Sequence, residues 1–419
     1  MNDDMDIERI RSRFPGLDGG TILLENAGGS QVPQSVADAI RDHLLHDYCQ
    51  LGAGYPASDR ATATVDLAHR FMNRYVNGEG IGHVVLGSSC TSLMHVLAGS
   101  VGRTLRAGDE IVVCEQGHEA NIGCWTDLER LGAVIRWWKV DPETGMLDPE
   151  DLREILSDRT RIVAFPHASN LLGEIVDVPA ITRMVHDAGG RVVVDGVAYA
   201  PPRAIDVRSW DVDFYAWSTY KVYGPHMGAL FGRSEAFEDL RGPNHFFIAD
   251  DDLPYKYELG GASHEGCAGL CALGGYLGEL AGSPVDSADE CGTDIVQRAF
   301  ERMKELEEPV QVRLMDRLAG HSAIRIVGPA SSDVDRRVAT VSFIHSERSP
   351  VEIVASAHAS GVGIRHGHMY AHRLCTAMGI DPDPGVVRIS AVHYNTISEI
   401  DHLMDALDPL LSGRSAGIS

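Results

Sequence analysis

Lysine is the most informative residue type in this sequence, because only four of its 36 basic residues are lysines. Lys221 follows the apolar run DFYAWS at 213–218 and precedes the chain-breaking pair Gly224-Pro225. We therefore expect it in a loop at the carboxyl end of a strand, where ligands bind in α/β folds. A lysine amine placed there can form a Schiff base with an aldehyde cofactor, although an isolated loop lysine is more often simply exposed. The other three lysines lie in polar or strand-end segments (Lys139, Lys256 and Lys304).

Two further polar residues stand at the expected ends of strands. Asp195 closes the apolar run RVVVD at 191–195, and His118 follows the run EIVVC at 110–114. A carboxylate in that position can keep the pyridine nitrogen of pyridoxal phosphate (PLP) protonated, which makes the ring an electron sink. An imidazole at the same edge can stack on an aromatic cofactor. Taken singly, Asp195 could be a helix cap and His118 a satisfied polar residue; their coincidence with Lys221 favours a PLP site.

A turn between a strand and a helix supplies a candidate phosphate site. Gly87, Ser88 and Ser89 join the run HVVLG to a helix that we expect to begin near Thr91. Free backbone N–H groups and the helix dipole bind phosphate in this geometry, although the signal alone is weak. The sequence contains no GxxxxGK[ST] and no HExxH pattern, so neither a P-loop nor a zincin is indicated.

The elements that must position these residues follow from the hydrophobic pattern. Helical stretches such as Pro149–Leu156 and Pro179–Ala188 alternate with short β-rich runs, which predicts βαβ units and a mostly parallel seven-stranded sheet covered by helices on both faces. The fold class is therefore α/β. The expected strands are 83–87, 110–114, 134–140, 161–166, 191–195, 213–218 and 228–232.

A second, smaller domain is expected in the C-terminal third. The pattern changes after Leu277 to a polar loop, a charged helix around Asp294–Glu307, and mixed strands and helices. A length of 419 residues also favours two cores over one. We predict a large domain over 20–294 and a small α+β domain over 295–412, to which residues 1–19 are added.

Composition narrows the class of partners and the location. The formal net charge is −24, which repels phosphate backbones and anionic lipid, so nucleic acid and membrane are poor partners. An acidic N-terminus without an apolar segment and the absence of a run of ~18 apolar residues indicate a cytoplasmic protein. The eight cysteines are scattered, which is unlike a disulfide framework.

Over roughly Ile22–Leu407 the sequence resembles the class V aminotransferases of fold type I, the group that contains cysteine desulfurases, selenocysteine lyases and isopenicillin N epimerase-like proteins. The resemblance implies the fold type I architecture, PLP as cofactor, an amino-acid substrate and a homodimer with its site at the interface. The pieces that carry it are HEANI, HASNLLGEIVDV, VVVDGVAYAPPRAIDV, DFYAWSTYKVYGP, ELGGASHEGCAGL and VVRISAVHYNTISEID.

The resemblance also implies individual roles. Lys221 matches the lysine that binds the cofactor covalently, Asp195 the pyridinium partner and His118 the ring-stacking histidine. Asn170 matches the asparagine near the cofactor's 3-oxygen and the substrate, and Arg388 the arginine that grips the substrate α-carboxylate. A guanidinium suits that task, because its planar fork binds a carboxylate in two places. The expected phosphate ligands are Ser88, Ser89 and Ser218, with Ser263 standing in the loop that typically serves the neighbouring subunit.

The departures from the family pattern bear on the reaction. Desulfurases carry a nucleophilic cysteine in a loop of the form R-x-G-H-H-C-A, and residues 365–371 here read RHGHMYA. Tyr370 occupies the cysteine position, so persulfide chemistry is not expected. We instead expect Arg365, His368 and Tyr370 to line the substrate pocket, and we expect no metal site. Ala198 also stands where the family has a glutamine beside the aspartate.

These features predict a PLP enzyme that acts on an amino acid, with Lys221 as the base that removes the α-proton. We favour β-elimination from an S-substituted cysteine, which releases thiol, pyruvate and ammonia. Alternatives are a decarboxylating or oxidatively deaminating enzyme, an epimerase, an aminotransferase, and a desulfurase that uses a non-standard cysteine. A non-catalytic PLP-fold scaffold belongs to a different class, and the retention of Lys221, Asp195, His118 and Arg388 argues against it.

Overall fold

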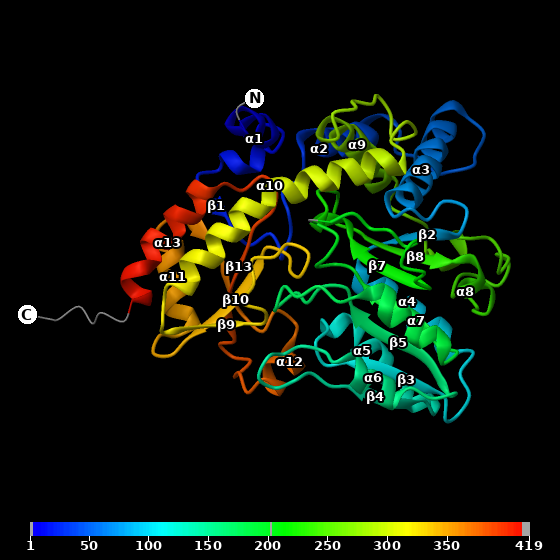
Figure 1. The fold of residues 1–419 in the computed structure, drawn as a ribbon. Helices are drawn as coiled ribbons and strands as arrows, with labels where there is room; N and C mark the ends of the chain where they lie inside the picture. Colours follow the sequence, from blue (N-terminus) through cyan, green and yellow to red (C-terminus); the bar gives the residue numbers. More distant parts are fainter. Residues whose placement is uncertain (1–2, 202, 413–419) are drawn as a thin grey trace, which may run out of the picture.

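The computed structural model describes residues 3–201 and 203–412, which form a large α/β part and a smaller α+β part (Figure 1). The large part is built on a seven-stranded sheet in the order β2-β8-β7-β6-β5-β3-β4. Only β8 runs antiparallel to its neighbours in that sheet. Each of the seven predicted runs forms one strand, and the predicted fold class is confirmed. The strands are β2 (Gly82–Gly87), β3 (Glu110–Cys114), β4 (Val134–Trp138), β5 (Thr160–Pro166), β6 (Arg191–Asp195), β7 (Phe214–Ser218) and β8 (Gly228–Arg233).

Helices cover both faces of this sheet. Along β6, Val192 and Val194 pack into one hydrophobic cluster and Val193 into another, because successive side chains of a strand point to opposite faces. Both faces are buried, which explains why the strands read as continuous apolar runs. The helices of the large part are α2 (Gln34–His46), α3 (Pro56–Tyr75), α4 (Cys90–Gly102), α5 (Gly123–Thr126), α6 (Pro149–Ile155), α7 (Val178–Asp187), α8 (Ser234–Glu238) and α9 (His264–Leu280).

The small part is built on a four-stranded antiparallel sheet in the order β12-β13-β10-β9. A two-stranded parallel pair, β1 with β11, lies beside it. The strands are β1 (Ile22–Leu23), β9 (Ile324–Val327), β10 (Thr340–His345), β11 (Val362–Gly363), β12 (Arg365–Gly367) and β13 (Val386–Ser390). The remaining helices are α1 (Asp3–Arg11), α10 (Thr293–Ala319), α11 (Pro350–Ala359), α12 (His372–Ala377) and α13 (Ile397–Leu411).

Helix α10 belongs to both hydrophobic cores. Its first half packs Phe300 and Met303 into the core of the large part, and its second half packs Leu314 into the core of the small part. Figure 1 shows this long helix running from one part to the other. The domain boundary expected near residue 295 falls at the start of this helix. From the N-terminal segment, Phe14 packs into the large core; residues 1 and 2 of the range assigned to the small domain lie outside the described residues. Over the described ranges, no helix combines the length and the apolar character needed to cross a membrane.

Candidate active site

The carboxyl ends of the parallel strands bring the predicted residues together at one edge of the large sheet. Lys221 lies in a 3-10 turn directly after β7, and Asp195 is the last residue of β6. Both line a small cleft of about 80 Å³ together with His118 and Asn170. Lys221, His118 and Asn170 also line an adjoining cavity of about 520 Å³, to which the small part contributes Arg388. Five residues that the sequence analysis picked out thus meet at the junction of the two parts.

Lys221 is buried, with 9% of its surface exposed. Burial, with a smaller contribution from the charge on Arg388, lowers the pKa of Lys221 to about 8. Water stabilises an ammonium better than a protein interior does, so burial shifts the protonation equilibrium of Lys221 toward the neutral amine. A lysine that loses its proton this readily can act as a nucleophile and as a base.

Asp195 is also buried, and its Oδ1 accepts a hydrogen bond from the backbone N–H of Val197 at 2.9 Å. Burial raises the pKa of this carboxyl, while the Val197 N–H and the charge of Lys221 act in the opposite direction. Gly196 lets the chain turn at this point, since a Cβ there would lie 2.1 Å from the Tyr215 ring. A buried carboxylate with one N–H donor retains capacity for a cationic partner in the cleft.

His118 is a neutral imidazole in this arrangement. Its Nδ1 accepts a hydrogen bond from the Ala120 N–H at 3.0 Å, which leaves the proton on Nε2. Burial first, then the charges of Lys221 and Arg388, lower the pKa of His118 to about 4. The ring therefore stays uncharged above about pH 5 and presents a flat, neutral face to the cleft.

Arg388 comes from β13 of the small part and is 97% buried. Its Nη1 donates to the backbone oxygen of Asn170 at 3.1 Å, and its buried Nε has no hydrogen-bond partner among the described residues. Burial lowers the pKa of Arg388 to about 10. A buried cation with an unsatisfied N–H is costly unless an anion binds to it, so this guanidinium is prepared for a carboxylate.

The N-terminus of α4 and the end of β7 supply the expected phosphate corner. Ser89 is the N-cap of α4 and exchanges hydrogen bonds with Ser92, and the hydroxyl of Ser88 lies 3.1 Å from that of Ser92. These serine side chains thus serve the helix cap, and the cleft is lined by Thr91 and Cys90 together with Ser218 from β7. A phosphate at this corner would meet the backbone N–H groups of the helix start.

A glycine allows the same corner to close. A Cβ at Gly228 would lie 2.2 Å from the backbone nitrogen of Cys90, so only glycine lets β8 begin against the first turn of α4. Ser263 lies elsewhere. It caps α9 and lines a separate cavity of about 370 Å³ with Tyr48, Cys49 and Gln50.

The three residues expected from the segment 365–371 all line the 520 Å³ cavity. Arg365 is largely exposed and its guanidinium pairs with Glu25 at 2.9 Å. His368 accepts a hydrogen bond from the backbone N–H of Tyr370 on its Nδ1. Tyr370 is 66% exposed, and its ring centroid lies 5.0 Å from that of His118.

Several cavity residues had no assignment from the sequence. Tyr220 lines both cavities, and its ring stacks on His226 at 4.4 Å; its position directly before Lys221 was the available signal. Pro382 and Pro384 also line the larger cavity, and Glu25, from the N-terminal segment, pairs with the lining residue Arg365. No motif marks these contacts, because they join segments that are distant in the chain.

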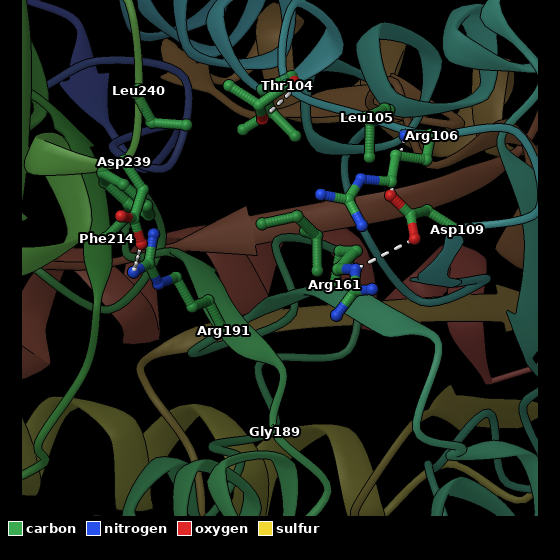
Figure 2. Close-up of a pocket in the computed structure, with 12 residues that line it drawn as sticks. Thr104, Leu105, Arg106, Asp109, Arg161, Gly189, Arg191, Phe214, Asp239 and Leu240 are labelled. Atoms are coloured by element: carbon green, nitrogen blue, oxygen red, sulfur yellow. Dashed lines mark hydrogen bonds and ion pairs between the residues drawn. The ribbon is translucent and has the colours of Figure 1, made fainter.

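A different cavity, of about 390 Å³, lies at the opposite edge of the sheet, where the parallel strands begin (Figure 2). Two of the arginines that line it form ion pairs: Arg161 at the start of β5 with Asp109, and Arg191 at the start of β6 with Asp239 (Figure 2). None of the predicted site residues lines it. The candidate active site is therefore the one at the edge that carries Lys221.

A family model described as Aminotransferase class-V matches residues 22–403. The chain belongs to the class V aminotransferase family. It is 40% identical over 413 residues to the Aminotransferase-like protein FGM3 of Gibberella zeae, covering 97% of this chain and 98% of that protein. It is 30% identical over 434 residues to the Cysteine desulfurase-like protein ustD of Aspergillus flavus, covering 97% and 91%. The apo structure of a cysteine desulfurase from Thermococcus onnurineus NA1 has the same fold, with a TM-score of 0.84, 24% identity, and coverage of 97% and 98%.

Class V aminotransferases use PLP, and the residues of this chain fit that cofactor. The cleft offers a desolvated amine at Lys221 for the aldehyde and a buried carboxylate at Asp195 for the pyridine nitrogen. His118 presents a neutral ring face, and the helix start at Cys90 presents N–H groups for the phosphate. The aldehyde, the pyridine nitrogen, the ring face and the phosphate of PLP would therefore each meet a chemically matched group in this class V aminotransferase.

The lowered pKa of Lys221 makes the stability of this class V aminotransferase depend on pH. The pKa of Lys221 in the folded protein, about 8, lies below the pKa of 10.5 of an unperturbed lysine. Between pH 8 and 10.5 the unfolded chain therefore binds more protons than the folded protein. Stability therefore rises with pH in that window. We expect Lys221→Met to stabilise the cofactor-free protein by about 3 kcal/mol at pH 7, and this gain to shrink toward zero near pH 10.

Urea unfolding of both proteins at several pH values measures this difference. Lys304→Met, at an exposed ion pair with Asp335, is the control for replacing a lysine at the surface. A gain that stays constant from pH 7 to pH 10 would contradict the lowered pKa.

Proposed function

We propose that this protein is a PLP-dependent enzyme that cleaves the C–S bond of an S-substituted cysteine by β-elimination, releasing thiol, pyruvate and ammonia. The observation that carries the proposal is the pairing of a buried amine on Lys221 with a buried, incompletely bonded guanidinium on Arg388 in one cavity. Proton removal from an α-amino acid requires a base, which the amine can be, and a group that holds the carboxylate, which the guanidinium can be.

Each residue has a defined task in that reaction. Arg388 holds the α-carboxylate through Nε and its remaining N–H groups, which fixes the α-carbon within the cavity. Lys221 removes the α-proton, for which its pKa of about 8 is well suited near neutral pH. Bound PLP supplies an electron sink for the α-carbon, and Asp195 and His118 are the residues that would hold its ring.

After the proton has moved to Lys221, the electrons of the former C–H bond form the Cα–Cβ double bond, and the Cβ–S bond breaks with its pair on sulfur. The sulfur takes up the proton held by Lys221 and leaves as the thiol. The organic product is 2-aminoacrylate, which takes up one water and yields pyruvate and ammonia. None of the described residues that line the 520 Å³ cavity is a cysteine. Cys90 lines only the cofactor cleft, and burial raises the pKa of its thiol. This supports elimination over persulfide transfer.

Transamination is the second candidate, because the relative with 40% identity is named an aminotransferase-like protein. Transamination, decarboxylation and epimerisation use the same anchors at Arg388 and Lys221. They differ in which bond at the α-carbon breaks and in where the proton returns. A product assay therefore separates them.

The test is a mass-spectrometric assay of the holoenzyme in heavy water with S-substituted cysteines and plain L-amino acids. We expect pyruvate and thiol in equal amounts from the S-substituted cysteines only. Release of carbon dioxide would indicate decarboxylation in place of elimination. Substrate that carries deuterium at the α-carbon, without pyruvate, would indicate epimerisation in place of elimination. A keto acid that keeps the sulfur substituent would replace elimination by transamination if the amino group stays on the cofactor, and by oxidative deamination if it is released as ammonia.

We further propose that the enzyme is a homodimer. The end of α2 and the following loop expose Leu45 and Tyr48, which are 66% and 70% accessible, beside the cavity that contains Ser263. Exposed apolar side chains next to a hollow suit a protein interface. Ser263 would then serve the site of the partner subunit. The cytoplasmic location stays a prediction.

A further inference from the structure

The turn formed by residues 368–371 holds two bulky residues in a backbone conformation that such residues rarely adopt. Met369 has a φ of 51° and Tyr370 a φ of 61°, both in the left-handed region. A non-glycine residue in this region is uncommon, and two in succession persist only where the surroundings impose them. The turn connects β12 to α12 and enters the 520 Å³ cavity.

The large part imposes this conformation through three contacts. The side-chain amide of Asn170 donates to the backbone oxygen of Met369 at 2.7 Å, and the backbone N–H of Glu119 donates to that of Tyr370 at 2.9 Å. The carboxylate of Glu119 also binds Arg373 through two hydrogen bonds of 3.0 Å. The turn is therefore held by two separate segments of the large part, at Glu119 and at Asn170.

The effect of the strained turn is to bury Met369 and expose Tyr370. Met369 is 8% exposed, whereas Tyr370 is 66% exposed with its ring on the cavity wall. Its centroid lies 5.0 Å from His118 and 6.3 Å from His368. An aromatic ring left open in a cavity is apolar surface available to a ligand.

The residues that bind the substrate determine which part of it lies against the ring of Tyr370. Arg388 takes the α-carboxylate and Lys221 faces the α-carbon, so the Cβ substituent must occupy the rest of the cavity. The apolar side chains of that wall include Tyr370, Pro382 and Pro384, with Ala27, Tyr220 and Met369 also among the lining residues; of the two tyrosine rings, that of Tyr220 is stacked on His226. We propose that Tyr370 determines specificity, selecting cysteines whose sulfur carries a large apolar group, such as a benzyl or long alkyl thioether. This inference rests on the proposed function for the identity of the substrate.

Binding of unreactive analogues to the holoenzyme tests the inference without turnover. 3-(Benzylthio)propanoate and 3-(methylthio)propanoate keep the carboxylate and the thioether but lack the amine. By calorimetry, we expect the benzyl compound to bind the unmodified protein at least tenfold more tightly. Tyr370→Ala should weaken benzyl binding about tenfold and methyl binding less than threefold, and Tyr370→Phe, which keeps the ring, should restore most of the benzyl affinity.

Tyr255→Ala is the matched control, because Tyr255 is 44% exposed and lies outside the residues that line the cavity. It should change neither affinity. The inference would be overturned if Tyr370→Ala weakened the binding of both analogues equally or weakened the binding of neither. If S-benzylcysteine is not cleaved but analogue selectivity depends on Tyr370, the proposed reaction fails and the specificity role stands. If S-benzylcysteine is cleaved but analogue binding does not depend on Tyr370, the proposed reaction stands and the specificity role of Tyr370 fails.

Discussion

Replacing Lys221 with alanine is expected to lower turnover at least a thousandfold and to abolish covalent attachment of PLP. The reason is that its amine is the only one of the four lysine amines that lines the cofactor cleft. Borohydride reduction of the holoenzyme followed by peptide mass spectrometry measures the attachment directly. In the unmodified protein the cofactor mass should appear on the peptide that contains Lys221 and on no other lysine peptide.

Lys256 provides a matched control, because it is also buried. Its ammonium donates to the backbone oxygens of Ile248 and His245 and pairs with Asp250 at 3.2 Å, so it serves the structure of its loop. Lys256→Ala should reduce stability and leave the cofactor attached at Lys221. Cofactor mass on Lys256, or retained turnover in Lys221→Ala, would refute the assignment.

The second large effect concerns Arg388. Arg388→Met is expected to raise KM for amino-acid substrates about a hundredfold while leaving the fold as stable as before or more stable by about 1 kcal/mol. The substrate loses its carboxylate partner, whereas the folded protein loses a buried cation whose Nε has no partner among the described residues. Steady-state kinetics and denaturant unfolding of the same preparation measure both quantities.

Arg337 is the matched control for this prediction. It is fully buried beside β10, and burial lowers its pKa to about 10, as for Arg388. Its guanidinium, however, donates to several backbone oxygens, among them those of Leu172 at 3.1 Å and Thr340 at 2.8 Å. Arg337→Met leaves these acceptors unpaired and should cost about 3 kcal/mol of stability with KM unchanged. The opposite pattern, in which Arg388→Met destabilises and KM stays constant, would make Arg388 structural.

Much of the large part could be predicted from the sequence. A strand buried on both faces must be apolar along its whole length, so the runs at 110–114 and 191–195 indicated strands without knowledge of the fold. Parallel strands place their carboxyl ends at one edge, so residues that follow such runs had to converge. Lys221 and Asp195 were found for this reason.

Other features depended on tertiary structure. Ser88 and Ser89 carried the phosphate signal, yet their hydroxyls complete a helix cap, and the next residues, Cys90 and Thr91, line the cleft. Hydrogen bonding within a turn depends on rotamers, which a motif does not encode. The sequence also did not show that α10 contributes to two cores, because one amphipathic pattern runs through the whole helix.

The order of apolar runs and strand-end residues determined the α/β fold and the cofactor edge, because both follow from local periodicity and chain direction. The substrate side of the site was decided by packing between the two parts. Arg388 bonds to Asn170, which is 218 positions away, and the left-handed Tyr370 is fixed by contacts from Asn170 and Glu119. Such contacts arise only when the two cores close on each other, and no local pattern records them.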